Sequence, residues 1–128
     1  MKDTYHSFVS RQAIVPAVKT AAENGTTIDL QGFGSALFSI NTGAVVADGD
    51  FGVKLQESDT TTSGDFTDVT AGDILGDVDA TLEASSTYDL GYTGRKRYVR
   101  LAVTKAGGTS IAIGAVAVLG HAAVSPIA

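Results

Sequence analysis

The sequence of 128 residues has no cysteine, no tryptophan and only two histidines, His6 and His121. The absence of cysteine excludes a disulfide scaffold, thiolate zinc sites and cysteine nucleophiles. Nine Lys and Arg residues against fourteen Asp and Glu residues leave a formal net charge of −5. A nucleic-acid-binding domain usually carries a basic surface, so we expect no nucleic-acid partner.

The sequence also lacks a long apolar run. Its most apolar stretch, residues 111–119, is about half of the ~20 residues that a helix needs to cross a bilayer. Near the N-terminus, Arg11, Pro16 and Lys19 interrupt the only aliphatic stretch, which makes it a poor signal peptide. We therefore expect no membrane partner.

Apolar and polar side chains alternate with a period of two along much of the chain, which is typical of β-strands. The alternation is clearest in residues 51–56, where Phe51, Val53 and Leu55 are expected to point inward. Three further ranges alternate in the same way: 26–30, 35–40 and 97–104. Residues 111–119 are apolar at every position, which predicts a central strand covered on both faces.

Turn-forming segments rich in glycine, asparagine and aspartate separate these ranges about every 8–20 residues. This spacing predicts an all-β fold, either a single antiparallel β-sandwich or a jelly-roll-like barrel. We expect one domain with three parts: an extended N-terminal arm of residues 1–20, the sandwich of residues 21–122 and a C-terminal tail of residues 123–128. Because the arm is apolar and an extended segment cannot satisfy its own backbone groups, it either folds back on its own sheet or binds a partner.

The sequence contains no recognisable catalytic motif. Each histidine lies near a terminus, and no Gly-x-Ser-x-Gly motif is present to form a nucleophile elbow. Eleven of the fourteen acidic residues lie between Asp48 and Asp89, but no segment there has the ligand spacing of an EF-hand calcium loop. We therefore predict a protein that is not an enzyme, with no catalytic residue, no cofactor and no metal site.

The only basic cluster lies in residues 94–100. Arg95, Lys96 and Arg97 are predicted to occupy a turn that leads into a strand and to face acidic loops. Those loops belong either to the same chain or to a neighbouring copy, and the sequence leaves both alternatives open. The three residues are therefore our candidate contacts between protomers.

Two segments together resemble a known group of proteins. The first runs from Val53 to Val69 and contains Leu-Gln-Glu-Ser-Asp followed by Phe-Thr-Asp-Val; the second runs from Gly94 to Leu101 and precedes a Gly-Gly turn and an Ala- and Val-rich final segment. The combination, which extends from about Ala13 to Pro126, resembles small structural proteins of tailed bacteriophages and prophages that are encoded near the major capsid gene.

This resemblance implies a virion component, and most specifically a capsid decoration (cement) protein on the outer surface of the phage head. The implied partners are the major capsid protein and further copies of the chain, as a homotrimer or another homo-oligomer. The implied location is the virion, after a soluble state in the host cytoplasm before assembly. In the N-terminal arm, Tyr5, Phe8, Val9 and Arg11 are the candidate contacts with the capsid.

Two alternatives remain open. One is a structural protein of the phage tail or of the head–tail junction. The other is a carbohydrate- or surface-binding β-sandwich module. Such modules usually display exposed aromatic side chains, and since tryptophan is absent the platform would have to be built from Tyr88, Tyr92 and Tyr98.

Overall fold

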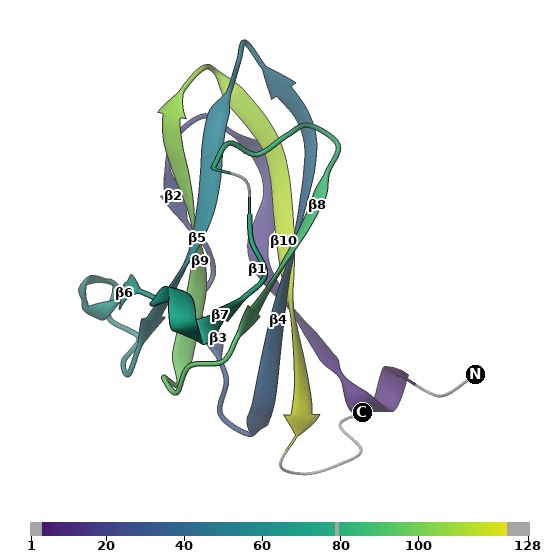
Figure 1. Ribbon diagram of the computed structural model, residues 1–128, viewed down its shortest axis with the longest axis vertical. Coiled ribbons are helices and arrows are strands. Elements are labelled where there is room, and N and C mark those ends of the chain that lie inside the picture. Colours follow the sequence, from purple (N-terminus) through teal and green to yellow (C-terminus); the bar gives the residue numbers. More distant parts are fainter. Residues whose placement is uncertain (1–3, 79, 123–128) are drawn as a thin grey trace.

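The structure is a computed structural model that describes residues 4–78 and 80–122. Within these residues it contains strands, turns and short 3-10 helices but no α-helix (Figure 1). Sheet A has the strand order β1 (Val9–Lys19), β10 (Ser110–Ala122), β4 (Phe33–Val46), β8 (Thr87–Tyr92) and β7 (Ile74–Leu75). Sheet B has the order β2 (Glu23–Asn24), β9 (Tyr98–Gly107), β5 (Asp50–Ser58) and β6 (Thr67–Asp68), and β3 (Ile28–Asp29) also pairs with β9. The 3-10 helices are η1 (Tyr5–Ser7), η2 (Ser63–Asp65) and η3 (Ala71–Asp73).

The predicted all-β class is confirmed. Every pair of neighbouring strands is antiparallel, and β5 and β9 lie in one layer while β8 and β10 lie in the other (Figure 1). The two sheets stay separate, so the fold is not a closed barrel, and the arrangement is sandwich-like.

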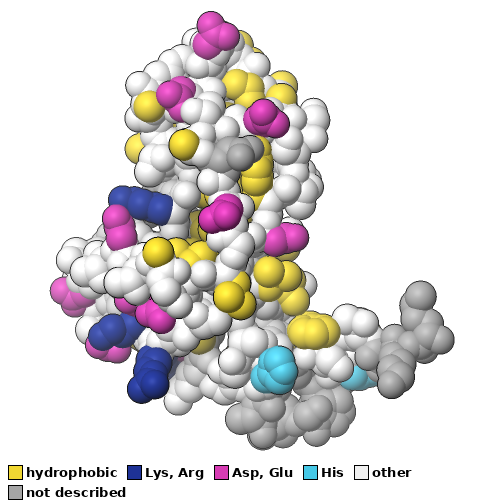
Figure 2. Space-filling model, viewed as in Figure 1, with side chains coloured by type: hydrophobic (Ala, Val, Ile, Leu, Met, Phe, Trp, Pro, Cys, Tyr) yellow, Lys and Arg dark blue, Asp and Glu magenta, His cyan; other side chains and the backbone are white. Residues whose placement is uncertain are grey.

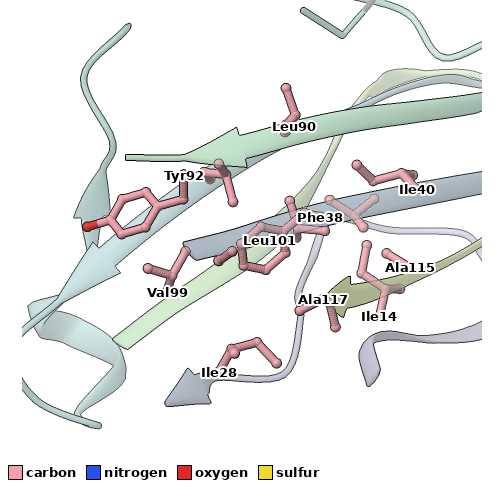
Figure 3. Close-up of a cluster of buried hydrophobic side chains, with 14 of the residues drawn as sticks. Ile14, Ile28, Phe38, Ile40, Leu90, Tyr92, Val99, Leu101, Ala115 and Ala117 are labelled. Atoms are coloured by element: carbon pink, nitrogen blue, oxygen red, sulfur yellow. The ribbon is translucent and has the colours of Figure 1, made fainter. Parts of the chain in front are cut away.

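The core lies between the two sheets, where each long strand contributes every second side chain. In β4, Phe38 and Ile40 are completely buried, and in β9, Val99 and Leu101 are completely buried. Figure 3 shows these side chains meeting between the layers. The period-two pattern predicted this inward face because burial on one side of a strand recurs at every second residue.

The pattern of β10 departs from the prediction. Its inward side chains from Ile111 to Leu119 are buried, as expected for a strand in the middle of a sheet. Its other face is half-buried or exposed between Ala112 and Val118, and no second layer formed by residues 4–78 or 80–122 lies above it. The expectation of cover on both faces is therefore wrong, and the outer face of sheet A is open to solvent.

The extended N-terminal arm is not confirmed, because β1 pairs with β10 from Val9 opposite Leu119 to Lys19 opposite Ile111. Ala13 and Ile14 belong to the hydrophobic core. The N–H of Thr26 donates to the carbonyl oxygen of Ala13 at 2.8 Å, which ties this strand to the start of sheet B. Of the two alternatives left open by the sequence, residues 9–19 adopt the first and fold back on their own sheet. The tail predicted at residues 123–128 lies outside the described residues.

Candidate interaction surfaces

The first candidate surface is the N-terminal end of the molecule, made by η1 and the start of β1. Tyr5 is 73% exposed, and its ring meets the His6 ring edge to face with 5.0 Å between the centroids. Phe8 is 42% exposed and rests on Gly120 of β10, where an added Cβ would lie 2.7 Å from the Phe8 ring. Glycine at this position therefore allows the ring to lie against the sheet while part of it faces solvent.

The structure places all four predicted capsid contacts in this N-terminal segment. Val9 is half-buried and paired with Leu119, so it contributes more to the sheet than to the surface. Arg11 is exposed, and its guanidinium donates a hydrogen bond to the carbonyl oxygen of Ser10 at 3.3 Å. Of the four candidate residues, Tyr5 and Phe8 are therefore the two whose apolar side chains are exposed to a partner.

The second candidate surface is the basic turn that precedes β9. Lys96 Nζ lies 2.7 Å from an oxygen of Asp59. Arg97 donates two parallel hydrogen bonds to Asp29, at 2.9 and 2.8 Å. The Arg97 hydrogen bonds, followed by that from the N–H of Gln31, lower the pKa of Asp29 to about 2. For Lys96 and Arg97, the acidic partners predicted from the sequence therefore come from the same chain.

The third member of the basic turn, Arg95, is exposed and makes no ion pair with any described residue. The hydrogen bond and charge of Asp59 raise the pKa of Lys96, and those of Asp29 raise the pKa of Arg97, so both cations are stabilised where they stand. That this turn forms contacts between protomers stays a prediction. Of its three basic residues, only Arg95 makes no ion pair with a described residue and could pair with an acidic group of another copy.

A buried tyrosine holds the basic turn in place. The Tyr92 hydroxyl donates to Glu57 Oε1 at 2.7 Å and accepts the backbone N–H of Lys96 at 3.1 Å. Burial, followed by the hydrogen bond to Glu57, raises the pKa of Tyr92 well above its ordinary value. Tyr92 belongs to the core, so it cannot form the aromatic platform considered above, and Tyr88 and Tyr98 are themselves half-buried.

The outer face of sheet B is polar, and its charged side chains are held by contacts within the chain. Arg100, the last residue of the basic cluster in residues 94–100, is only 7% exposed. Its guanidinium lies 4.2 Å from the centre of the Phe66 ring and donates to Gln56 at 2.8 Å and to Ser63 at 3.0 Å. The amide of Gln56 in turn donates to Asp68 at 3.1 Å. The strand pattern put Arg100 on the outer face correctly, but it gave no sign that the segment of residues 59–66 covers it.

The outer face of sheet A has the opposite character, and sequence reasoning missed it. Val18, Leu37, Leu75 and Val116 are exposed apolar side chains on this sheet. A shallow hollow of about 670 Å³ lies on the same face, and small residues such as Gly43, Ala112 and Gly114 are part of its lining. The sequence feature that points to this face is the set of small uncharged residues at every second position of residues 112–118. The same residues led to the expectation that a second layer covers this face.

Charged side chains are unevenly distributed between the two layers. In Figure 2 the visible Lys and Arg side chains lie on the left of the molecule, over β5, β6 and β9, and none lies on the right over β8 and β10. Among the described strands of sheet A, Asp89 is the one charged side chain on the outer face, between the inward-facing Tyr88 and Leu90. This face is therefore suited to an uncharged partner surface.

Within residues 4–78 and 80–122, no three His, Cys, Asp or Glu side chains gather as ligands for a metal ion. Over the same residues, no helix is long and apolar enough to cross a membrane. In comparisons with known proteins, no family model matches the sequence and no curated protein matches it significantly.

Proposed function

We propose that this chain is a non-enzymatic structural protein of a bacteriophage virion, and specifically a capsid decoration protein. It binds the major capsid protein on the outer surface of the head and stabilises the lattice. It reaches this location after a soluble stage in the host cytoplasm. The family resemblance of residues 13–126 suggests this function, and the homotrimer that the resemblance implies remains a prediction.

The observation that carries the proposal is the pair of exposed aromatic side chains at the N-terminal end. Phe8 rests on Gly120 near the end of β10, and Tyr5 belongs to η1, in a segment that extends from the body of the molecule (Figure 1). Buried aromatic anchors provide much of the binding energy at protein interfaces. Because a lattice repeats, a protein that touches several capsid subunits gains occupancy through effective concentration even when each contact is weak.

The test is cryo-electron microscopy of particles from the phage or prophage that encodes the chain. We expect density for many copies on the outer surface of the head, with the N-terminal end facing the capsid protein. Density only on the tail or at the head–tail junction supports that alternative. Particles without density for this chain contradict the proposal, and specific binding on a glycan array supports the carbohydrate-binding module.

A double variant, Tyr5→Ser with Phe8→Ser, tests the contact residues. Because each aromatic anchor contributes about 2 kcal/mol and every ~1.4 kcal/mol is tenfold in affinity, we expect the loss of both to weaken particle binding by about a hundredfold to a thousandfold. The control is Val15→Ser, which removes an exposed apolar side chain at another position of β1. Both proteins should keep the far-ultraviolet circular dichroism of the parent, and equal particle occupancy for all three contradicts the assignment of Tyr5 and Phe8.

A further inference from the structure

The outer face of sheet A has a raised half and a hollow half. The raised half consists of side chains aligned across neighbouring strands: Val118 of β10 lies opposite Leu37 of β4, and Leu37 lies opposite Gly91 of β8. Leu75 of β7 packs over Gly91, because a Cβ added at Gly91 would lie 3.2 Å from the Cβ of Leu75. Val116, next along β10, is 42% exposed and stands at the boundary between the two halves, because it also lines the hollow.

The hollow half lies further along the same strands, toward the start of β10. It is lined by Asn41 and Gly43 of β4 and by Ala112 and Gly114 of β10. Pro16 of β1 forms a wall beside it, because an added Cβ at Gly114 would lie 3.0 Å from the proline ring. Small residues thus make the floor of a depression next to a ridge of larger ones.

We propose that a second copy of this chain covers this face, with sheet A packed against sheet A. The ridge of each copy enters the hollow of the other. The two copies are related by a twofold axis that lies in the plane of the interface and crosses the strands near Val116. Rotation about this axis reverses the strand direction of the second copy, so the ridge of one copy lies over the hollow of the other. Such an interface uses the same surface on both partners.

The size of the face agrees with a weak dimer. Four strands about 4.8 Å apart and about eight residues of β10 with a rise of about 3.3 Å each give about 500 Å² per copy. Two copies would bury about 1,000 Å², which is near the lower limit for a specific interface. We therefore expect a dissociation constant in the micromolar range or weaker.

The charge distribution also favours a second copy. The net charge of −5 makes two copies repel each other over most of their surface. The outer face of sheet A is where this repulsion is smallest, because Asp89 is the one charged outward side chain on its described strands. Asp89 lies opposite Ser39, in the same row as Val116, so the proposed axis brings the two Asp89 side chains toward each other.

The experiment is sedimentation equilibrium of the full chain from about 5 to 500 μM, the range in which an interface of this size should dissociate. We expect a monomer–dimer equilibrium that the double variant Leu37→Asp with Val116→Asp abolishes. Thr104→Asp is the control, because it adds a carboxylate to an exposed position of β9 on the opposite sheet, and it should leave the equilibrium within about twofold of the parent.

Two uncharged substitutions separate this geometry from non-specific apolar association. Ala112→Leu fills the hollow and should weaken dimerisation about fivefold or more, although it adds apolar surface. Asp89→Asn removes the facing carboxylates and should strengthen dimerisation by a few-fold. If Ala112→Leu strengthens dimerisation, the result contradicts the packing of the ridge into the hollow.

A parent protein that stays monomeric at 500 μM overturns the proposal, and so does a dimer or trimer that Leu37→Asp with Val116→Asp leaves intact. If the parent is monomeric and the same variant loses particle binding, the face belongs to a virion partner and not to a second copy. The proposal rests only on this face, so it succeeds or fails independently of whether Tyr5 and Phe8 contact a capsid.

Discussion

At the scale of single residues, the most consequential polar contact is the ion pair between Arg97 and Asp29. It joins two residues 68 positions apart in the sequence, Arg97 in the turn just before β9 and Asp29 in β3. Its two parallel hydrogen bonds match the planar guanidinium to the carboxylate. About half of each side chain remains exposed, so solvent screens the pair and limits its contribution to stability.

This ion pair predicts a pH dependence of stability. In the folded chain the pKa of Asp29 is about 2, below its ordinary value of 3.8. A pKa lowered by folding stabilises the fold above the unfolded pKa, and this contribution is lost as the pH falls. The loss should run from about pH 5 to about pH 2.

We therefore expect Asp29→Asn to lower the free energy of unfolding by about 0.5–1 kcal/mol at pH 7 and by progressively less toward pH 2. Urea denaturation at a series of pH values measures the difference. Asp77→Asn, at an exposed loop aspartate that makes no ion pair with a described residue, is the control. A difference between Asp29→Asn and the parent that is the same at pH 7 and pH 2.5 contradicts this account.

At the scale of strands, periodicity identified β4, β5 and β9, because each buries one face over at least nine residues, and an uninterrupted apolar run identified β10. It did not identify β1, since register shifts between Gln12 and Ile14 and between Ile14 and Ala17 break the alternation, and Pro16 stands within the strand. The alternation in residues 26–30 predicted a strand that the structure limits to the two residues Ile28–Asp29 of β3, and β7, also of two residues, is too short to show a period. What a pattern of two cannot show is whether another layer covers a given face.

The same limit applies to the candidate surfaces. The apolar character of Tyr5 and Phe8 was visible in the sequence, and their exposure agrees with it. The burial of Arg100 depends on Phe66 and Ser63, more than thirty residues away along the chain, so no local pattern predicts it. The open face of sheet A was misjudged for the same reason, because small apolar residues occur on both covered and uncovered faces.

If β1 is an integral strand, its buried side chains must contribute to stability like those of any core strand. Ile14 is 2% exposed, whereas Val15, the next residue, is 53% exposed. We expect Ile14→Ala to reduce the free energy of unfolding by about 2–4 kcal/mol, because it removes buried methyl groups and leaves a cavity.

The matched control is Val15→Ala, for which we expect a loss of no more than about 0.5 kcal/mol. Chemical denaturation followed by far-ultraviolet circular dichroism measures both variants. Equal, small losses for the two would mean that residues 9–19 are detached in solution, and the N-terminal arm predicted from the sequence would then be correct.

At the scale of the whole molecule, the two outer faces have different physical chemistry. Sheet B carries charged side chains on its outer face, among them the ion pair of Lys54 with Asp68 at 3.2 Å. Sheet A carries an almost uncharged apolar face. The chain thus has two distinct candidate surfaces for self-association, the basic turn around Arg95 and the outer face of sheet A, and they differ in their response to salt.

Salt should strengthen self-association if copies meet through sheet A. The buried surface is uncharged, so electrostatics enters mainly as repulsion between two acidic molecules, and added salt screens that repulsion. Raising sodium chloride from 0.05 to 0.5 M, where the Debye length falls from about 14 Å to about 4 Å, should lower the dissociation constant a few-fold. An interface in which the basic turn of one copy binds the acidic loops of another would respond in the opposite direction, because salt screens the attraction that forms it. Sedimentation equilibrium across this salt range, repeated with Arg95→Ser, decides between the two surfaces. If salt and the loss of Arg95 both weaken association, the contact lies at the basic turn. If salt strengthens association and Arg95→Ser leaves it unchanged, the contact lies on sheet A.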